Sequence, residues 1–318
     1  MGHQGFTGPN GTTRGSGVSC RGDTPVRWHG WVPATLAVLA LCGGEVARAQ
    51  FATSVQAVEV YATVTRADGL AVPDLVQPNF EILEDGVRQP ISVFAAGEFP
   101  LIVALGVDRS LSMRGEPLRL AIRASQAFLR VLRPADRSMV WAIADGAEVI
   151  APLDQPREAQ IAAVAALFPW STTALYDGVV AALDRLDPEP GRQAVVLFTD
   201  GADRYSTATA GAVLDRARRS RALVYSVAVG KTRPPLLAEL ASVSGGRFIE
   251  VHRMEGLEGA LAAVASELRG QYLLGYVPER RPGDTAERWR SISVRLTGPR
   301  GQAPAGLQVR ARTGYQGR

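Results

Sequence analysis

Apolar and polar residues follow two different rhythms along this chain of 318 residues. In the middle of the chain, continuous apolar runs alternate with segments whose apolar residues recur at helical spacing. The run Leu101–Val107 predicts a strand buried on both faces, and the apolar positions from Leu118 to Leu132 predict an amphipathic helix that ends before Pro134. Further strands are predicted at residues 139–143, 149–153, 194–198, 223–229 and 247–250, and further helices at 156–167, 173–186, 208–220, 234–243 and 256–269. This alternation is typical of a doubly wound α/β domain with a mostly parallel sheet, which we assign to residues 99–270.

Both flanks of this domain alternate with a period of two, which is typical of half-buried strands. On the N-terminal side, residues 58–65 alternate, and the two short runs 80–83 and 91–94 are predicted to form a hairpin through Glu84-Asp85-Gly86. On the C-terminal side, the strands are predicted at residues 291–296 and 307–312.

Neither flank has enough strands to cover its own apolar face. We therefore expect residues 50–98 and 271–318 to pack together as one small β-rich subdomain beside the α/β domain.

Residues 1–49 have the features of a secretory signal. The apolar run Trp31–Gly43 is followed by the small-x-small pattern Ala47-Arg48-Ala49. The run is shorter than the ~20 residues of a membrane span, so an exported protein without a transmembrane segment in its mature chain is expected. Leu39-Ala40-Leu41-Cys42 resembles a lipoprotein box, which would attach a lipid at Cys42. Because Leu41 stands where that motif needs a small residue, cleavage after Ala49 and release to the periplasm or the cell exterior are favoured.

Composition excludes several classes of function. The chain has two Cys, at positions 20 and 42, and three His, of which only His252 follows the signal. Zinc sites of the Cys/His type and Cys-His nucleophiles are therefore excluded. Of 35 basic and 31 acidic residues, four and two lie in residues 1–49, which leaves 31 against 29. Because basic and acidic residues are nearly equal in number, the charge does not indicate a nucleic-acid partner.

Three segments rich in side-chain oxygen are predicted at one edge of the sheet. Asp108, Ser110 and Ser112 follow the first strand, residues 171–173 open a helix, and Asp200 follows the strand at 194–198. Ligands of open parallel sheets bind at the carboxyl ends of the strands. Carboxylate and hydroxyl oxygens without nitrogen or sulfur favour a hard cation, Mg²⁺ or Mn²⁺.

These segments resemble the metal-ion-dependent adhesion site (MIDAS) of the von Willebrand factor A (VWFA) domain. The family's pattern is Asp-x-Ser-x-Ser, a distant Thr and a later Asp, which here correspond to Asp108, Ser110, Ser112, Thr173 and Asp200. Thr173 is chosen because the family's Thr directly precedes the stretch Ala-Leu-Tyr-Asp. The resemblance implies that these side chains hold the cation and that an Asp or Glu of a partner protein completes its coordination. One position departs from the pattern, since Leu111 stands where the family commonly has Gly.

The flanks resemble those of a bacterial exported VWFA-related subgroup first recognised in Acidobacteria. The resemblance rests on three segments: NFEILEDGVRQPISVF at 79–94, YLLGYVP at 272–278 and VRARTGYQ at 309–316. It implies a non-enzymatic, cation-dependent adhesion module of the bacterial envelope.

Two alternatives remain open at this point. Asp108 could be the nucleophile of a haloacid-dehalogenase-like phosphotransferase or hydrolase, although that chemistry needs a second carboxylate where Ser110 stands. The protein could also be a structural envelope scaffold with an incidental metal ion. His252 follows a predicted strand without a nucleophile motif, which favours a packing or surface role.

Overall fold

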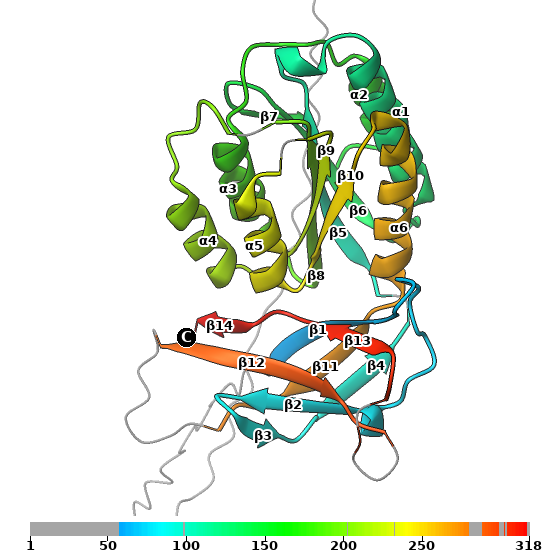
Figure 1. Ribbon diagram of the computed structural model, residues 1–318, viewed down its shortest axis with the longest axis vertical. Helices are drawn as coiled ribbons and strands as arrows, with labels where there is room; N and C mark the ends of the chain where they lie inside the picture. The colour runs from blue at the N-terminus through cyan, green and yellow to red at the C-terminus, as the bar shows by residue number, and fades with distance from the viewer. Residues whose placement is uncertain are drawn as a thin grey trace, which may run out of the picture. The chain divides into compact units, whose positions relative to one another are not determined.

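The apolar strands and amphipathic helices fold into the α/β architecture that the sequence predicts (Figure 1). The computed structural model describes residues 57–97, 99–201, 203–231, 233–279, 288–298, 302 and 304–316. The predicted signal at residues 1–49, with Cys42, lies outside the described residues.

Among the described residues, the largest sheet has six strands in the order β10-β9-β8-β5-β6-β7. In chain order they are β5 (Leu101–Asp108), β6 (Arg137–Ile143), β7 (Ala147–Ala151), β8 (Arg192–Thr199), β9 (Leu223–Val229) and β10 (Arg247–Val251). Every residue of β5 and β8 is buried. The winding direction reverses between these two strands, so their carboxyl ends border the crevice where such sheets bind ligands.

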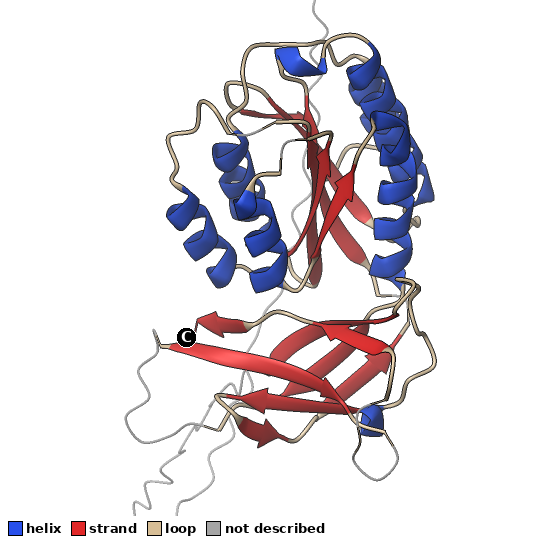
Figure 2. Ribbon diagram, in the orientation of Figure 1, coloured by secondary structure: helices blue, strands red, loops and turns tan. Residues whose placement is uncertain are grey.

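Helices cover both faces of this sheet (Figure 2). On one face lie α1 (Glu116–Val131), α2 (Arg157–Ala165) and α6 (Leu257–Arg269), and on the other lie α3 (Leu175–Leu186), α4 (Ala210–Arg219) and α5 (Pro235–Ser244). The helices and strands of this domain begin and end within about two residues of their predicted bounds. Gly106 of β5 permits tight pairing with β6, because a Cβ there would lie 2.5 Å from the Trp141 ring.

One edge of the sheet differs from a simple alternation of strands and crossovers. β7 runs antiparallel to β6, with Ala147 opposite Ile143. The three residues between these strands form a tight connection, and a parallel crossover needs a dozen or more residues. The sheet is therefore mostly parallel, with β7 as its antiparallel edge strand.

The described strands outside this sheet form two four-stranded antiparallel sheets, β13-β1-β11-β4 and β14-β12-β2-β3. Their bounds are β1 (Val58–Arg66), β2 (Phe80–Glu84), β3 (Val87–Gln89), β4 (Val93–Ala96), β11 (Tyr272–Tyr276), β12 (Trp289–Leu296), β13 (Leu307–Arg310) and β14 (Gly314–Gln316). Each sheet combines strands from before and after the α/β domain. Their apolar faces share one core, which includes Val60, Phe80, Leu274 and Ile292.

The predicted hairpin between residues 80–83 and 91–94 is wrong. The turn at Asp85-Gly86 joins β2 to β3, and Pro90 directly follows β3. Because proline has no N–H to donate to a ladder, it ends this pairing. The chain then passes to the other sheet, where β4 pairs with β11. The pattern of apolar residues does not predict β11 and β14.

A buried carboxylate links the strands of the second small sheet to β11. Glu84 is 3% exposed, and it accepts hydrogen bonds from Arg290 Nη1 at 2.7 Å, Tyr276 OH at 2.6 Å and Tyr315 OH at 2.9 Å. Burial and the Glu84 carboxylate raise the pKa of both tyrosine hydroxyls, so both remain protonated donors. Strands from both flanks therefore depend on one acidic side chain.

A second buried polar cluster joins the α/β domain to the small sheets, within the compact unit Thr53–Arg318. Arg192, the first residue of β8, donates from Nη1 to Leu268 O at 2.6 Å and from Nη2 to Phe99 O at 3.1 Å. Gln271 is fully buried, and its amide donates to Thr63 Oγ1 at 3.0 Å and Tyr225 OH at 3.2 Å. The amino end of β8 is thereby held against the segments that lead into and out of the domain.

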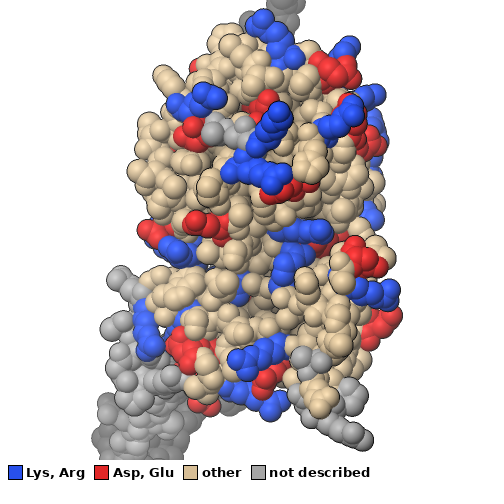
Figure 3. Space-filling model, in the orientation of Figure 1, with Lys and Arg blue, Asp and Glu red and all other residues tan. Residues whose placement is uncertain are grey.

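Charged side chains of both signs are interspersed on the face shown in Figure 3. Across the part of the chain that the structure describes, no helix is both long enough and apolar enough to cross a membrane.

We expect Glu84→Ala to lower the free energy of unfolding by about 3 kcal/mol or more, because it removes the acceptor of three hydrogen bonds in a buried cluster. Urea denaturation of the purified protein measures this loss. The control is Glu81→Ala, since Glu81 lies on the same strand and pairs with Arg88, whose side chain is 75% exposed. That pair should contribute less than about 1 kcal/mol. Equal losses in the two variants would contradict a central role for Glu84.

Candidate metal centre

Asp108, the last residue of β5, has no exposed surface. Its Oδ1 accepts a hydrogen bond from the Ser110 backbone N–H at 2.9 Å, and its Oδ2 accepts one from Thr199 Oγ1 at 2.6 Å. Thr199 ends β8, which pairs in parallel with β5. The parallel register therefore places the Thr199 hydroxyl beside the carboxylate.

The surroundings of Asp108 oppose its negative charge. Burial raises the pKa of this carboxyl, the hydrogen bonds from Thr199 and Ser110 lower it, and the nearby Asp200 carboxylate raises it further. In the described part of the chain, no salt bridge includes Asp108 or Asp200. Two neighbouring carboxylates without a basic side chain form a site that a cation would stabilise.

The serine hydroxyls connect Asp108's loop to Asp200. Ser110 Oγ and Ser112 Oγ are 2.9 Å apart, and Ser112 Oγ donates to Asp200 Oδ1 at 2.8 Å. Ser110 is 2% exposed, whereas Ser112 is exposed at the surface. The network thus runs from a buried carboxylate to solvent.

Thr173 lies just before α3, at the same edge of the sheet, and is 4% exposed. Among the hydrogen bonds of the described residues, none joins its hydroxyl to the other four side chains. Its segment is instead tied to the Asp108 loop through the backbone, by Leu111 N to Ser171 O at 3.0 Å and Trp170 N to Arg109 O at 2.8 Å. Ser171 has φ of 53°, a strained conformation that these contacts hold.

A further loop, residues 203–208, is held on the first turn of α3. Asp177 accepts hydrogen bonds from Thr207 N and Ala208 N, each at 2.9 Å. In return, Asp203 Oδ1 accepts from Tyr176 N at 3.1 Å, and Ser206 Oγ accepts from Asp177 N at 3.0 Å. These reciprocal bonds fix the loop beside Thr173.

The donors available at this site are hard oxygens. The described residues contain no group of three or more His, Cys, Asp or Glu side chains that could hold a metal. Two carboxylates supported by neutral hydroxyls remain, a set that suits Mg²⁺ or Mn²⁺. His252 is exposed in the segment after β10.

Two features of this site do not follow from the sequence predictions. Thr199 had no assigned role, although it stands directly before Asp200 at the end of a buried strand. The anchoring role of Asp177 was also missed. The sequence does show that Asp177 lies near the start of a predicted helix, just after a predicted ligand segment. It does not show the groups that Asp177 binds, because these lie about 30 residues away and are brought close only by the fold.

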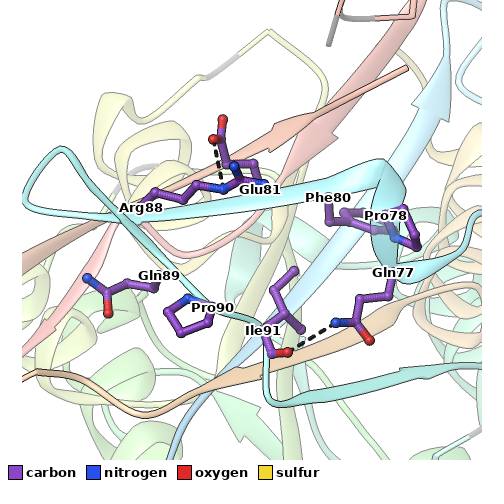
Figure 4. Close-up of a pocket in the computed structure, with 8 residues that line it drawn as sticks. All are labelled: Gln77, Pro78, Phe80, Glu81, Arg88, Gln89, Pro90 and Ile91. Carbon is purple, nitrogen blue, oxygen red and sulfur yellow. Dashed lines mark hydrogen bonds and ion pairs between the residues drawn. The ribbon is translucent and has the colours of Figure 1, made fainter. Parts of the chain in front are cut away.

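Two hollows lie away from these residues. One of about 500 Å³ is bordered by η1 (Gln77–Asn79), β2 and β3, where Gln77 donates to Ile91 O and Glu81 pairs with Arg88 (Figure 4). Another of about 610 Å³ lies between α5, β10 and the strands β1, β12 and β13. The candidate metal residues line neither of these two hollows.

The sequence profile of the von Willebrand factor type A domain matches residues 103–202, a range that includes all five candidate ligands. Residues 103–202 therefore match a von Willebrand factor type A domain, and the α/β fold around them is consistent with that family. The match does not extend to the two small sheets, and no curated protein is similar enough to count as a match.

Two solved structures of one protein show a similar fold at low sequence identity. Proximal thread matrix protein 1 from the mussel byssus has 18% identity and a TM-score of 0.50, with 59% of this chain and 51% of that chain covered. A second structure of that protein, with a zinc-occupied MIDAS motif, gives the same identity, TM-score and coverage of this chain, with 50% of that chain covered. A von Willebrand factor type A structure from Catenulispora acidiphila has 16% identity and a TM-score of 0.49, and covers 73% of this chain and 71% of its own. This chain thus spans about half the length of the mussel protein.

We expect Asp177→Ala to speed tryptic cleavage after the exposed Arg204 by about tenfold or more, because it removes two charge-assisted hydrogen bonds that hold this loop. Mass spectrometry of the fragments over time gives the rate. Asp184→Ala is the control, since Asp184 lies on the same helix and pairs with Arg216 at the surface. Unchanged cleavage in Asp177→Ala would show that Asp177 does not anchor the loop.

Proposed function

We propose that this protein is an exported, non-enzymatic binding module that captures a carboxylate of a partner protein through a divalent cation. Mg²⁺ or Mn²⁺ is the proposed ion, and its proposed ligands are Asp108, Ser110, Ser112, Thr173 and Asp200. Von Willebrand factor type A domains with a MIDAS motif are metal-dependent adhesion or protein-binding modules, which is the general class of this domain.

The burial of Asp108 beside Asp200, without a basic partner in the described chain, carries this proposal. An ionised carboxylate in such a place is costly unless a positive charge compensates it. The hydroxyls of Ser110 and Ser112 complete a set of oxygen donors that leads to the surface. The zinc-occupied MIDAS of the mussel byssus protein gives a precedent on the same fold.

The donor set also explains why a carboxylate would be the ligand. Two carboxylates just balance the double positive charge of the ion, and the neutral hydroxyls add no negative charge. The bound ion would therefore remain a Lewis acid that attracts an Asp or Glu side chain of the partner.

The location follows from the signal-like segment rather than from the site. Residues 1–49 resemble a secretory signal, and the mussel relative is a matrix protein of the byssus. We therefore place the protein in the periplasm, on the envelope or outside the cell, with cleavage after Ala49 favoured over a lipid at Cys42. The division into segments 50–98, 99–270 and 271–318, and the relation to the bacterial VWFA-related subgroup, are part of this proposal.

The residue two positions after Asp108 favours binding over phosphoryl transfer. That chemistry needs a second carboxylate as general acid, and Ser110 stands in its place. No contact among the described residues favours the scaffold alternative specifically.

We expect Asp108→Asn to weaken Mg²⁺ and Mn²⁺ binding by about 100-fold or more, because it removes one of the two charged ligands. Substitution of a residue that only supports a metal ligand already lowers metal affinity by about 10–100-fold. Titration calorimetry measures the affinity, and the metal-induced rise in melting temperature should be lost in parallel. Asp154→Asn is the matched control, since its side chain is 91% exposed at a distant salt bridge. Equal metal affinity in the wild type and Asp108→Asn would refute the assignment of this ligand.

Without metal, Asp108 should make stability depend on pH. Because its pKa is raised in the folded protein, the folded state holds the proton more tightly than the unfolded chain does, and the free energy of unfolding falls as pH rises above 3.8. Asp108→Asn should lack this contribution, so the difference between the variant and the wild type should grow in the variant's favour with pH. Urea denaturation of both proteins in EDTA, at a series of pH values above 3.8, measures this difference in the free energy of unfolding. A wild type that gains stability relative to Asp108→Asn over this range would contradict the raised pKa.

A further inference from the structure

Exposed apolar side chains gather on the three loops that form the candidate metal centre. Among the described residues, ten large hydrophobic side chains are exposed, and only three of these are aromatic: Phe168 at 56%, Trp170 at 51% and Tyr205 at 62%. All three lie on loops of this edge of the domain. Together with Leu111, which is 49% exposed, we call them the apolar rim.

The rim residues are joined to the candidate ligands through backbone hydrogen bonds. Leu111 N donates to Ser171 O at 3.0 Å, Trp170 N donates to Arg109 O at 2.8 Å, and Tyr205 N donates to Thr173 O at 3.2 Å. Leu111 itself stands between Ser110 and Ser112. The rim is therefore part of the same surface as the metal centre.

Two of the rim side chains, Phe168 and Trp170, contact other side chains before any partner binds. The Arg109 guanidinium lies 5.3 Å from the Phe168 ring and pairs with Glu148 at 2.7 Å. The Phe168 and Trp170 rings meet edge to face at 6.2 Å. Rigid aromatic side chains lose little conformational entropy on binding, which makes them effective contact residues.

The charges beside the rim suit an acidic partner. Arg114 and Arg204 are exposed, each within three residues of a rim residue. Within the described chain, neither side chain takes part in a salt bridge. Free guanidinium groups next to an exposed apolar surface attract negative charge and speed the encounter with an acidic segment.

We propose that the apolar rim selects a protein segment in which an acidic side chain is flanked by aromatic or large aliphatic side chains. This inference rests on the proposed function: the acidic side chain approaches the metal ion while its apolar neighbours pack on Leu111, Phe168, Trp170 and Tyr205. A carboxylate alone occurs on every protein surface, so the packing on the rim supplies the specificity. Leu111, which departs from the family pattern, contributes one of these contacts.

The test is an array of short peptides of equal length, probed with the full chain in Mg²⁺ and in EDTA. The central residue is Asp, Glu, Asn or Gln, and the flanking residues are drawn either from Phe, Tyr, Leu and Ile or from Ser and Gly. We expect Mg²⁺-dependent binding to concentrate on peptides with an acidic centre and apolar flanks. Asn and Gln centres should lose this binding, because they carry no charge for the metal.

Two variants then test the rim itself. Trp170→Ser and Tyr205→Ser should each weaken binding to the selected peptides by about tenfold or more, the loss usual for a central aromatic contact. Both should keep the wild-type melting temperature and the wild-type Mg²⁺ affinity, since the changed side chains are exposed and are not ligands. Val131→Ser is the control, because Val131 is 42% exposed at the end of α1 and outside the rim.

The outcomes separate this inference from the proposed function. If metal titration shows no binding, the proposed function fails. If metal binds but peptide binding ignores the flanking residues, is absent throughout the array, or survives Trp170→Ser and Tyr205→Ser unchanged, the rim inference is overturned and the metal site stands. A Mg²⁺-dependent dimer of the protein that these variants abolish, without peptide binding, would show that the rim contacts a second copy instead.

Discussion

The parallel pairing of β5 with β8 is the constraint on which the rest of the structure depends. Both strands are buried along their whole length, so helices must cover both faces of the sheet. The pairing also brings the carboxyl ends of the two strands together, which places the Thr199 hydroxyl 2.6 Å from Asp108 and lets Ser112 reach Asp200. The core and the candidate metal centre are thus consequences of the same register.

The two ends of β8 have different tasks. At its amino end, the buried Arg192 donates to Leu268 O and Phe99 O, where the chain enters and leaves the domain. At its carboxyl end, Thr199 and Asp200 belong to the candidate metal centre. Because one rigid strand joins the two ends, the small sheets support the domain from the side opposite the candidate binding surface.

Much of the α/β domain could be predicted from sequence, since continuous apolar strands and amphipathic helices have distinct periods. The errors lie where pairing partners are distant or strands are short. The Asp85-Gly86 turn was recognised, but its second strand was misassigned because Pro90 and the pairing of β4 with β11 decide where the chain goes. β11 and β14 have no clear alternation, and each becomes a strand only through a partner far away in sequence.

The sequence by itself determined the type of fold and the oxygen donors of the candidate site, because strand burial, helix period and the spacing of Asp108, Ser110 and Ser112 are local properties. The tertiary structure alone decided how Asp108 is held, and that the loops with the exposed Phe168, Trp170 and Tyr205 adjoin the candidate metal centre. These features depend on contacts between segments tens of residues apart, such as Leu111 with Ser171 and Asp177 with Thr207. A linear pattern of residue types records which side chains are present, but their mutual distances follow from the register of strands and the anchoring of loops.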